Sequence, residues 1–164
     1  MKEAFEIKRK VFTIILMLGI IALCNVTSSN PHNENIDLTD KRVLFLSSYS
    51  PSFETFFKQV EGLKSVLDKK RVILDIEFMD SKRFYTDENY EHFYESLKYK
   101  IDNTEKYDVV IVGDDNALVF VTEHEELFPD VPIVFLGIND TENARTLGEN
   151  PSITGIYESV SLSG

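Results

Sequence analysis

The sequence of 164 residues has little cysteine and little histidine. Cys24 is the single cysteine, and there are three histidines. One thiol cannot form an internal disulfide, and no cluster of cysteine and histidine has the spacing of a zinc site. A disulfide-stabilised scaffold and a zinc protein are therefore excluded.

Glycine-bearing catalytic motifs are missing as well. The seven glycines form no G-x-G-x-x-G fingerprint, no P-loop and no G-x-S-x-G elbow. Ser47 or Ser48 could act as a nucleophile only beside a histidine, and we expect His92 and His124 to lie mid-helix in solvated stretches. The chain therefore does not read as an enzyme of these classes.

Positive charge is scarce, since 17 Lys and Arg face 28 Asp and Glu and give a net charge of -11. Residues 1–28 carry a local balance of +2, so the remainder carries -13. Such a body is repelled by nucleic acid and by anionic lipid. The apolar content of 43% predicts a globular domain, with no nucleic-acid partner.

The first 28 residues differ from the rest. A basic stretch, Lys8–Lys10, precedes an uninterrupted apolar run at 11–24, and polar residues follow. This order predicts a signal peptide or membrane anchor over 1–28, which places the remainder outside the cytoplasm. Whether the segment is cleaved before Ser29 or retained stays open, as does lipidation of Cys24. Residues 29–41 are polar and aperiodic and read as a tether.

From residue 42 onward, short apolar runs alternate with helical periodicity. The expected strands cover 42–48, 71–80, 107–113, 131–137 and 152–158, and the expected helices cover 53–70, 87–101, 116–128 and 141–148. The first helix should bury Phe53, Phe56, Phe57, Val60, Leu63 and Leu67, and the second Tyr90, Phe93, Tyr94, Leu97 and Ile101.

This alternation predicts an α/β fold, a three-layer Rossmann-like parallel sheet of about five strands with helices on both faces. We expect the strand order 2-1-3-4-5, with the apolar third strand in the centre. Ligands of such sheets bind beyond the carboxyl ends of the strands.

The residues at those ends are polar. The candidate ligand-binding residues are Ser48, Tyr49, Ser50, Asp80, Lys82, Asp114, Asp115, Asn116, Asn139, Asp140 and Glu158. Helix capping is the simplest explanation for several of them. Ser50 before Pro51, one aspartate of the adjacent pair, and Asn139 or Asp140 could each cap a helix.

Capping does not explain the second of the two adjacent aspartates, Asp114 and Asp115. Two neighbouring carboxylates repel each other unless a cation neutralises them. That cation could be Mg²⁺ or the ammonium of a ligand. A receiver domain would need acidic residues at the end of the first strand, where the chain has Leu46-Ser47-Ser48. An exported hydrolase using either aspartate stays open as a third alternative.

A binding pocket accounts for the set better, with no cofactor and no metal. Serine hydroxyls and helix N–H groups suit a carboxylate, the aspartates suit an ammonium, and Tyr49 can stack on an apolar portion. We therefore expect a small amino-acid-like or other polar organic ligand.

The stretches "VLFLSSYSPSFETFFKQVEGL", "FMDSKRF", "DVVIVGDDNALVFV", "LFPDVPIVFLGIND" and "ITGIYE" resemble the ABC-transporter substrate-binding-like family of type I periplasmic-binding-protein folds. The resemblance runs from about Val43 to the C-terminus. Many members have a histidine where this chain has Ser50, and a tryptophan near Thr55, while this chain has no tryptophan.

The resemblance implies an extracytoplasmic sensor module of a histidine kinase or diguanylate cyclase, without enzymatic activity of its own. The alternative is the substrate-binding component of an ABC transporter. The family has two lobes, so residues 42–164 should form the first lobe, apparently truncated before the second. A lone lobe should bind its ligand weakly and self-associate.

Overall fold

The computed structural model describes residues 37–158, and the expected signal segment and most of the tether lie outside them. In chain order the elements are β1 (Arg42–Ser47), α2 (Glu54–Leu67), the 3₁₀ turn η1 (Asp68–Lys70), β2 (Ile73–Phe78), α3 (Asp87–Asp102), β3 (Val109–Gly113), α4 (Asp115–Glu123), the 3₁₀ turn η2 (Glu125–Leu127), β4 (Ile133–Ile138), α5 (Thr141–Leu147) and β5 (Ile153–Tyr157). The predicted alternation of strands and helices is confirmed.

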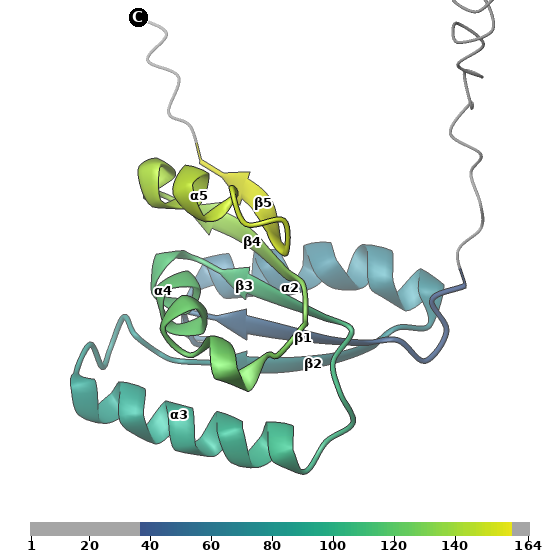
Figure 1. Cartoon of the computed structure of the whole chain (residues 1–164), viewed down its shortest axis with the longest axis horizontal. Helices are drawn as coiled ribbons and strands as arrows, with labels where there is room; N and C mark the ends of the chain where they lie inside the picture. Colours follow the sequence, from purple (N-terminus) through teal and green to yellow (C-terminus); the bar gives the residue numbers. More distant parts are fainter. Residues whose placement is uncertain (1–36, 159–164) are drawn as a thin grey trace, which may run out of the picture. The chain divides into compact units, whose positions relative to one another are not determined.

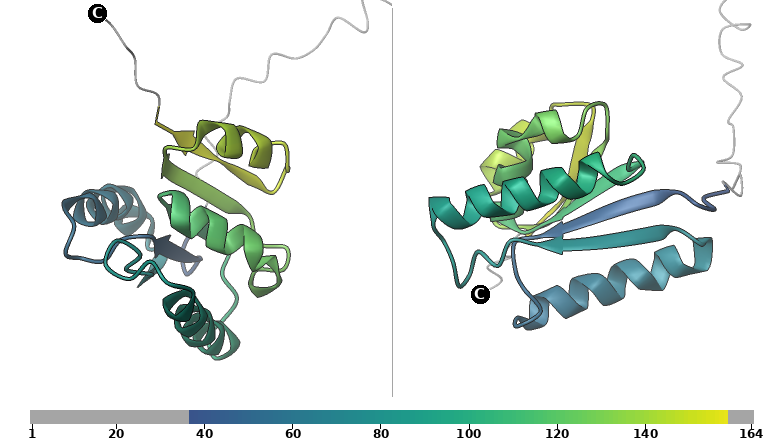
Figure 2. Two further views of the ribbon diagram at one scale, coloured as in Figure 1. Left: turned by 90° about the vertical axis from the view of Figure 1, so that its left-hand side faces the viewer. Right: turned by 90° about the horizontal axis from the view of Figure 1, so that it is seen from below.

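The five strands form one parallel sheet in the order β2-β1-β3-β4-β5, as predicted (Figure 1). The first connection runs toward β2 and the later ones run the opposite way across the sheet. Because such crossovers are right-handed, α2 covers one face while α3, α4 and α5 cover the other (Figure 2). The protein therefore has the predicted α/β, Rossmann-like arrangement.

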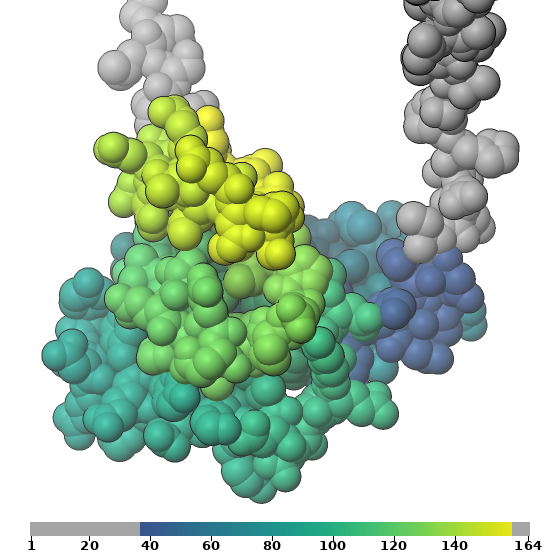
Figure 3. Space-filling model, viewed as in Figure 1, coloured from purple at the N-terminus to yellow at the C-terminus, as the bar shows by residue number. Residues whose placement is uncertain are grey.

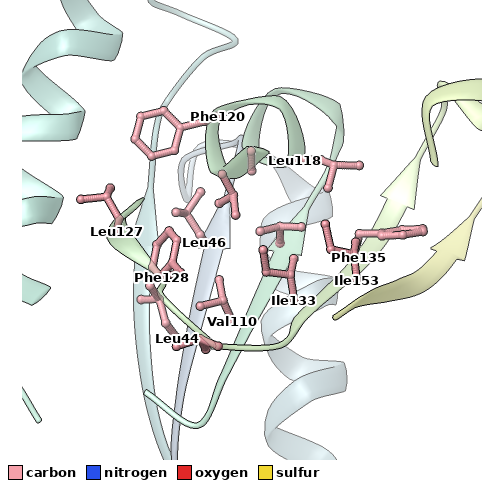
Figure 4. Packing of buried hydrophobic residues seen from close by; sticks show 14 of the residues in the cluster. Leu44, Leu46, Val110, Leu118, Phe120, Leu127, Phe128, Ile133, Phe135 and Ile153 are labelled. Atoms are coloured by element: carbon pink, nitrogen blue, oxygen red, sulfur yellow. The ribbon is translucent and has the colours of Figure 1, made fainter. Parts of the chain in front are cut away.

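The main core lies between the sheet and the helices α3, α4 and α5 (Figure 4). Leu44 and Leu46 of β1, Val110 and Val112 of β3, and Phe120 of α4 are fully buried. The predicted stripe of α3 faces this core: Leu97 is buried, and its other members pack against the cluster from the side. Burial on both faces explains why β1 and β3 read as continuous apolar runs.

Several details differ from the sequence expectations. Phe57 is 57% exposed rather than buried. Of the other residues expected on the buried stripe of α2, Phe56 is buried and Phe53, Val60, Leu63 and Leu67 are half-buried. The strand expected at 71–80 is shortened to β2, since Arg71 and Asp80 have φ angles of 55° and 56°, which a strand does not tolerate. These residues mark the turns at its two ends.

The helix expected at 116–128 is also interrupted. α4 ends at Glu123, and His124 caps it before η2 begins. His124 is therefore not mid-helix. It is half-buried, with its ring centroid 4.6 Å from that of Tyr94 and 4.7 Å from that of Phe120.

Candidate functional site

All five strands point the same way, so the residues that follow them gather along one edge (Figure 1). The predicted site residues Ser48, Tyr49 and Ser50 follow β1, Asp80 and Lys82 follow β2, Asp114, Asp115 and Asn116 join β3 to α4, Asn139 and Asp140 follow β4, and Glu158 follows β5. Their positions on one edge agree with the sequence analysis, although their side chains have different roles.

Ser48 links β1 to α4 inside the fold. Its fully buried hydroxyl donates to the Gly113 carbonyl at 2.9 Å and accepts from the backbone N–H of Ala117 at 2.8 Å. The backbone oxygen of Ser48 accepts from the Ser81 hydroxyl, which in turn accepts from the Asn116 amide at 2.9 Å. Ser48 and Asn116 therefore connect neighbouring loops, and the first turn of α4 is capped from β1.

The capping role expected for Ser50 is wrong. Pro51 and the next residue form a turn, α2 begins at Glu54, and Phe53 takes the N-cap position. Ser50 is buried instead, and its hydroxyl makes no regular hydrogen bond within the described chain. The hydroxyl nevertheless lies close enough to Asp80 to help lower the pKa of that carboxyl.

The main partner of Asp80 is Arg83. The Arg83 Nε donates to both Asp80 oxygens, at 3.0 and 2.8 Å, and Nη2 donates as well. These bonds lower the pKa of the Asp80 carboxyl, against the opposing effect of burial. Asp80 is thus held as a carboxylate in a local ion pair, and Arg83 is a neighbour that sequence reasoning did not place in the site.

Asp114 is the buried acid of the site, with an exposed fraction of 5%. Burial raises the pKa of its carboxyl to about 6; the charges of Asp115 and Glu158 add to the rise, while Gln59 and Lys82 oppose it. The backbone of Asp114 has a φ of 70°, and its side chain makes no cap hydrogen bond to α4. The expected capping role is therefore not the role of its carboxyl.

Gln59 of α2 is a site residue that the sequence analysis missed. Its Nε2 donates to Asp114 Oδ2 at 3.1 Å, and its Oε1 is buried without a partner among the described residues. Two glycines leave room for this pair: a Cβ on Gly113 would lie 2.9 Å from Gln59 Oε1, and one on Gly137, where φ is +68°, would lie 3.3 Å from Asp114 Oδ1. A polar residue between Phe56 and Val60 on the buried stripe was the available signal.

Asp115 holds the loop after β4. Its carboxylate accepts from the Asn139 backbone N–H, the Asn139 side-chain amide and the Asp140 backbone N–H, each at 3.0 Å. Asp140 then caps α5 by accepting from Asn143 at 3.0 Å, as predicted. The two adjacent aspartates thus serve different neighbours: Asp114 faces α2, and Asp115 faces the β4–α5 loop.

Tyr49, Lys82 and Glu158 complete the edge. The Lys82 ammonium lies 4.9 Å from the centroid of the Tyr49 ring. Burial raises the pKa of the Tyr49 phenol, and the charges of Asp114, Asp115 and Glu158 raise it further. These groups therefore act on one another, and we call Tyr49, Lys82, Asp114, Asp115, Asn139 and Glu158 the strand-end site.

The strand-end site carries an excess of negative charge. Three acids face one lysine in it, and none of these acids forms an ion pair with another described residue. Within residues 37–158, no group of three His, Cys, Asp or Glu side chains is placed to hold a metal ion. The groups of the strand-end site can form hydrogen bonds, make aromatic contacts and attract a cation.

Comparison with protein-family models, with curated proteins and with solved structures found no match to the chain. Along residues 37–158, no helix has the length and apolarity that crossing a membrane requires.

Proposed function

We propose that this domain binds a small polar organic molecule that carries an ammonium group. The observation that supports this proposal is the clustering of Asp114, Asp115 and Glu158 on one edge with no ion pair among the described residues. The carboxylates of such a cluster repel one another, and a bound cation would relieve this repulsion. The repulsion is consistent with a binding role at this edge.

The neighbouring residues favour an amino-acid-like ligand over a simple cation. Lys82 supplies one exposed ammonium that can attract a carboxylate, and the Tyr49 ring beside it offers apolar surface. A zwitterion could place its ammonium near the acids and its carboxylate near Lys82. The ligand class expected from the sequence is therefore retained as part of the proposal.

Binding of this kind should release protons. Asp114 has a pKa of about 6, so near pH 5 its carboxyl is mostly protonated and attracts a cation weakly. An ammonium at the site would favour the ionised form. The affinity should therefore be lower at pH 5 than at pH 7, where the carboxylate is already charged.

In the wider proposal, the domain is an extracytoplasmic sensor module of a membrane signal-transduction protein, of the histidine kinase or diguanylate cyclase type. The resemblance of its strand-end stretches to type I periplasmic-binding-protein folds supports this role. It equally supports a transporter substrate-binding component. The two roles predict different mature proteins: a sensor keeps its N-terminal anchor and Lys8, whereas a secreted binding protein begins near Ser29. Mass spectrometry of the mature N-terminus distinguishes them.

The binding proposal is tested by titration calorimetry with a panel of amino acids and related zwitterions. We expect one member or more to bind, and Glu158→Gln and Lys82→Gln each to weaken that binding roughly tenfold, about 1.4 kcal/mol. Glu149→Gln and Lys69→Gln are matched controls at exposed positions outside the site. No heat from any panel member, or equal loss in the controls, contradicts the proposal.

A further inference from the structure

A separate hollow lies between α3 and α4, beside the strand-end site. Its volume is about 360 Å³, and its lining consists of Tyr85, Thr86, Asp87, Tyr90, Asn116, Val119, Glu123 and His124. The two helices lie next to each other on one face of the sheet, as the teal and green surfaces in Figure 3 show. None of the residues of the strand-end site is among these lining residues, so the two sites are distinct. Of the residues predicted from the sequence to bind a ligand, the lining includes Asn116.

Aromatic rings form one corner of the hollow. The rings of Tyr85 and Tyr90 stand at 89° to each other with their centroids 5.9 Å apart. Tyr85 is 72% exposed, so most of its ring is available to a ligand. His124 adds a third ring, held in place by its packing on Phe120 and Tyr94. The ring of Tyr85 is therefore accessible, while the ring of His124 is packed against two other rings.

The charge of the lining is negative. Asp87 and Glu123 contribute carboxylates, and no lysine or arginine is among the lining residues. Glu123 acts directly on the aromatic corner: burial raises the pKa of the Tyr90 phenol, and the charges of Tyr85 and Glu123 raise it further. His124 Nδ1 lies 3.4 Å from Glu126, which adds a third acid behind the ring.

From this combination we infer a second binding site, for a small organic cation of the methylated-ammonium type. Aromatic faces attract such cations through their quadrupole, and nearby carboxylates add to that attraction. A metal ion would lack a ligand cluster here, since the part of the chain from 37 to 158 contains none. An anion would be repelled. Because the hollow is open to solvent, the dissociation constant should be on the order of 1 mM.

This inference does not depend on the proposed function, although the strand-end site also attracts cations. The experiment must therefore locate the bound probe. The probe is choline, and its neutral counterpart is 3,3-dimethyl-1-butanol, which has the same shape without the charge. Both are titrated into the full isotope-labelled chain while backbone amide signals are followed by NMR.

We expect choline to shift the amide signals of Tyr85, Tyr90 and Asn116 in a saturable way, and the neutral alcohol to bind at least about tenfold more weakly. Tyr85→Ala and Glu123→Gln should each weaken choline binding about fivefold or more. Tyr99→Ala is the matched control, because Tyr99 is 70% exposed on α3 and does not line the hollow. Glu149→Gln is the control for charge. Neither control should change the affinity.

Three results would overturn the inference: the absence of saturable shifts at choline concentrations about tenfold above the expected dissociation constant, equal binding of choline and the neutral alcohol, and choline shifts confined to Tyr49 and Glu158. The last result would place choline at the strand-end site and leave the proposed function intact. In the same way, loss of choline binding in Glu158→Gln but not in Glu123→Gln would place choline at the strand-end site rather than in the hollow. The two sites can thus fail independently.

Discussion

Two acids near the amino ends of the strands, Asp75 and Asp108, have cationic partners, whereas the acids of the strand-end site have none among the described residues. Near the amino ends of the strands, Asp108 accepts from Lys41 Nζ and from the Arg42 backbone N–H, both at 2.8 Å. Asp75, in the first half of β2, accepts from the Arg42 guanidinium at 2.5 Å and from the Tyr107 hydroxyl at 3.1 Å. Each of these acids has a cationic partner.

Toward the carboxyl end of β2, Glu77 pairs with Lys100 and Asp80 pairs with Arg83. Of the acids of the strand-end site, Asp114 and Asp115 accept from amides rather than from cations. The pKa values reflect this difference: the bonds from Lys41 and Arg42 lower the pKa of Asp108, whereas burial raises the pKa of Asp114 to about 6. Asp75 and Asp108 thus have cationic partners, whereas no acid of the strand-end site forms an ion pair with another described residue.

The largest expected effect is the pH dependence of Asp114. Its folded pKa is raised above the ordinary 3.8, so the protonated form favours folding and the benefit is lost as the pH rises through 6. Between pH 4 and pH 7, wild type should lose about 2.4 kcal/mol of unfolding free energy relative to Asp114→Asn. Denaturant unfolding at both pH values measures this difference.

Asp108→Asn is the matched control at the other end. The folded pKa of Asp108 is lowered, so its contribution is present above its unfolded pKa and is lost as the pH falls through the folded one. The wild-type advantage over Asp108→Asn should therefore shrink at low pH, the opposite trend. The same trend in both variants contradicts the comparison.

A second effect tests whether hydroxyls at the carboxyl ends serve the fold rather than a ligand. In Ser48→Ala, the Ala117 N–H loses its acceptor inside the protein, which costs on the order of 2 kcal/mol of unfolding free energy. Ser52→Ala, in the exposed turn before α2, should cost less than about 0.5 kcal/mol. Thermal unfolding of both variants measures the difference. Equal stability of the two variants would show that the Ser48 hydroxyl does not stabilise the fold.

The sequence predicted the fold well because the deciding signals were local. Continuous apolar runs marked β1 and β3, and the 3.6-residue period marked α2 and α3. The expected strand order was also right, although the apolar run of β3 predicted only its central place and not the order of the other strands. Capping was predictable where donor and cap are close in sequence, as for Asp140 and Asn143.

Contacts between residues far apart in sequence were not predictable in the same way. Ser48 caps α4 across 69 positions, and Gln59 meets Asp114 across 55. Such pairs depend on the crossover geometry, to which local patterns are insensitive. Ser50 was assigned to a helix cap because the Ser-Pro pair suits one, but the turn after Pro51 moved the helix start to Glu54.

A third effect concerns the ion pair of Asp75. Removing its carboxylate in Asp75→Ala leaves the Arg42 guanidinium, whose side chain is 18% exposed, and the Tyr107 hydroxyl without their acceptor. Because Asp75 itself is partly solvated, the cost should be limited to about 1 kcal/mol of unfolding free energy. Denaturant unfolding measures it, with Asp68→Ala on η1 as an exposed control. No loss relative to that control would show that solvent replaces the pair.

The smallest effect is expected for Lys41, whose ion pair with Asp108 is exposed on both sides, at 53% and 38% of the two side chains. Lys41→Ala should leave the free energy of unfolding nearly unchanged, and the remaining effect should shrink at high salt, because solvent and ions screen such pairs. The backbone N–H of Arg42 still donates to Asp108 in this variant.

Lys82→Ala is the counterpart at the other end of the sheet. It removes the one cationic charge that opposes the raised pKa of Asp114, so the apparent pKa of that carboxyl should move upward, as followed by NMR of its side-chain resonance. Lys41→Ala should leave it unchanged. If both variants moved the pKa equally, the charges of the two ends would be coupled through the sheet, and the contrast between paired and unpaired acids would not be a local property of each end.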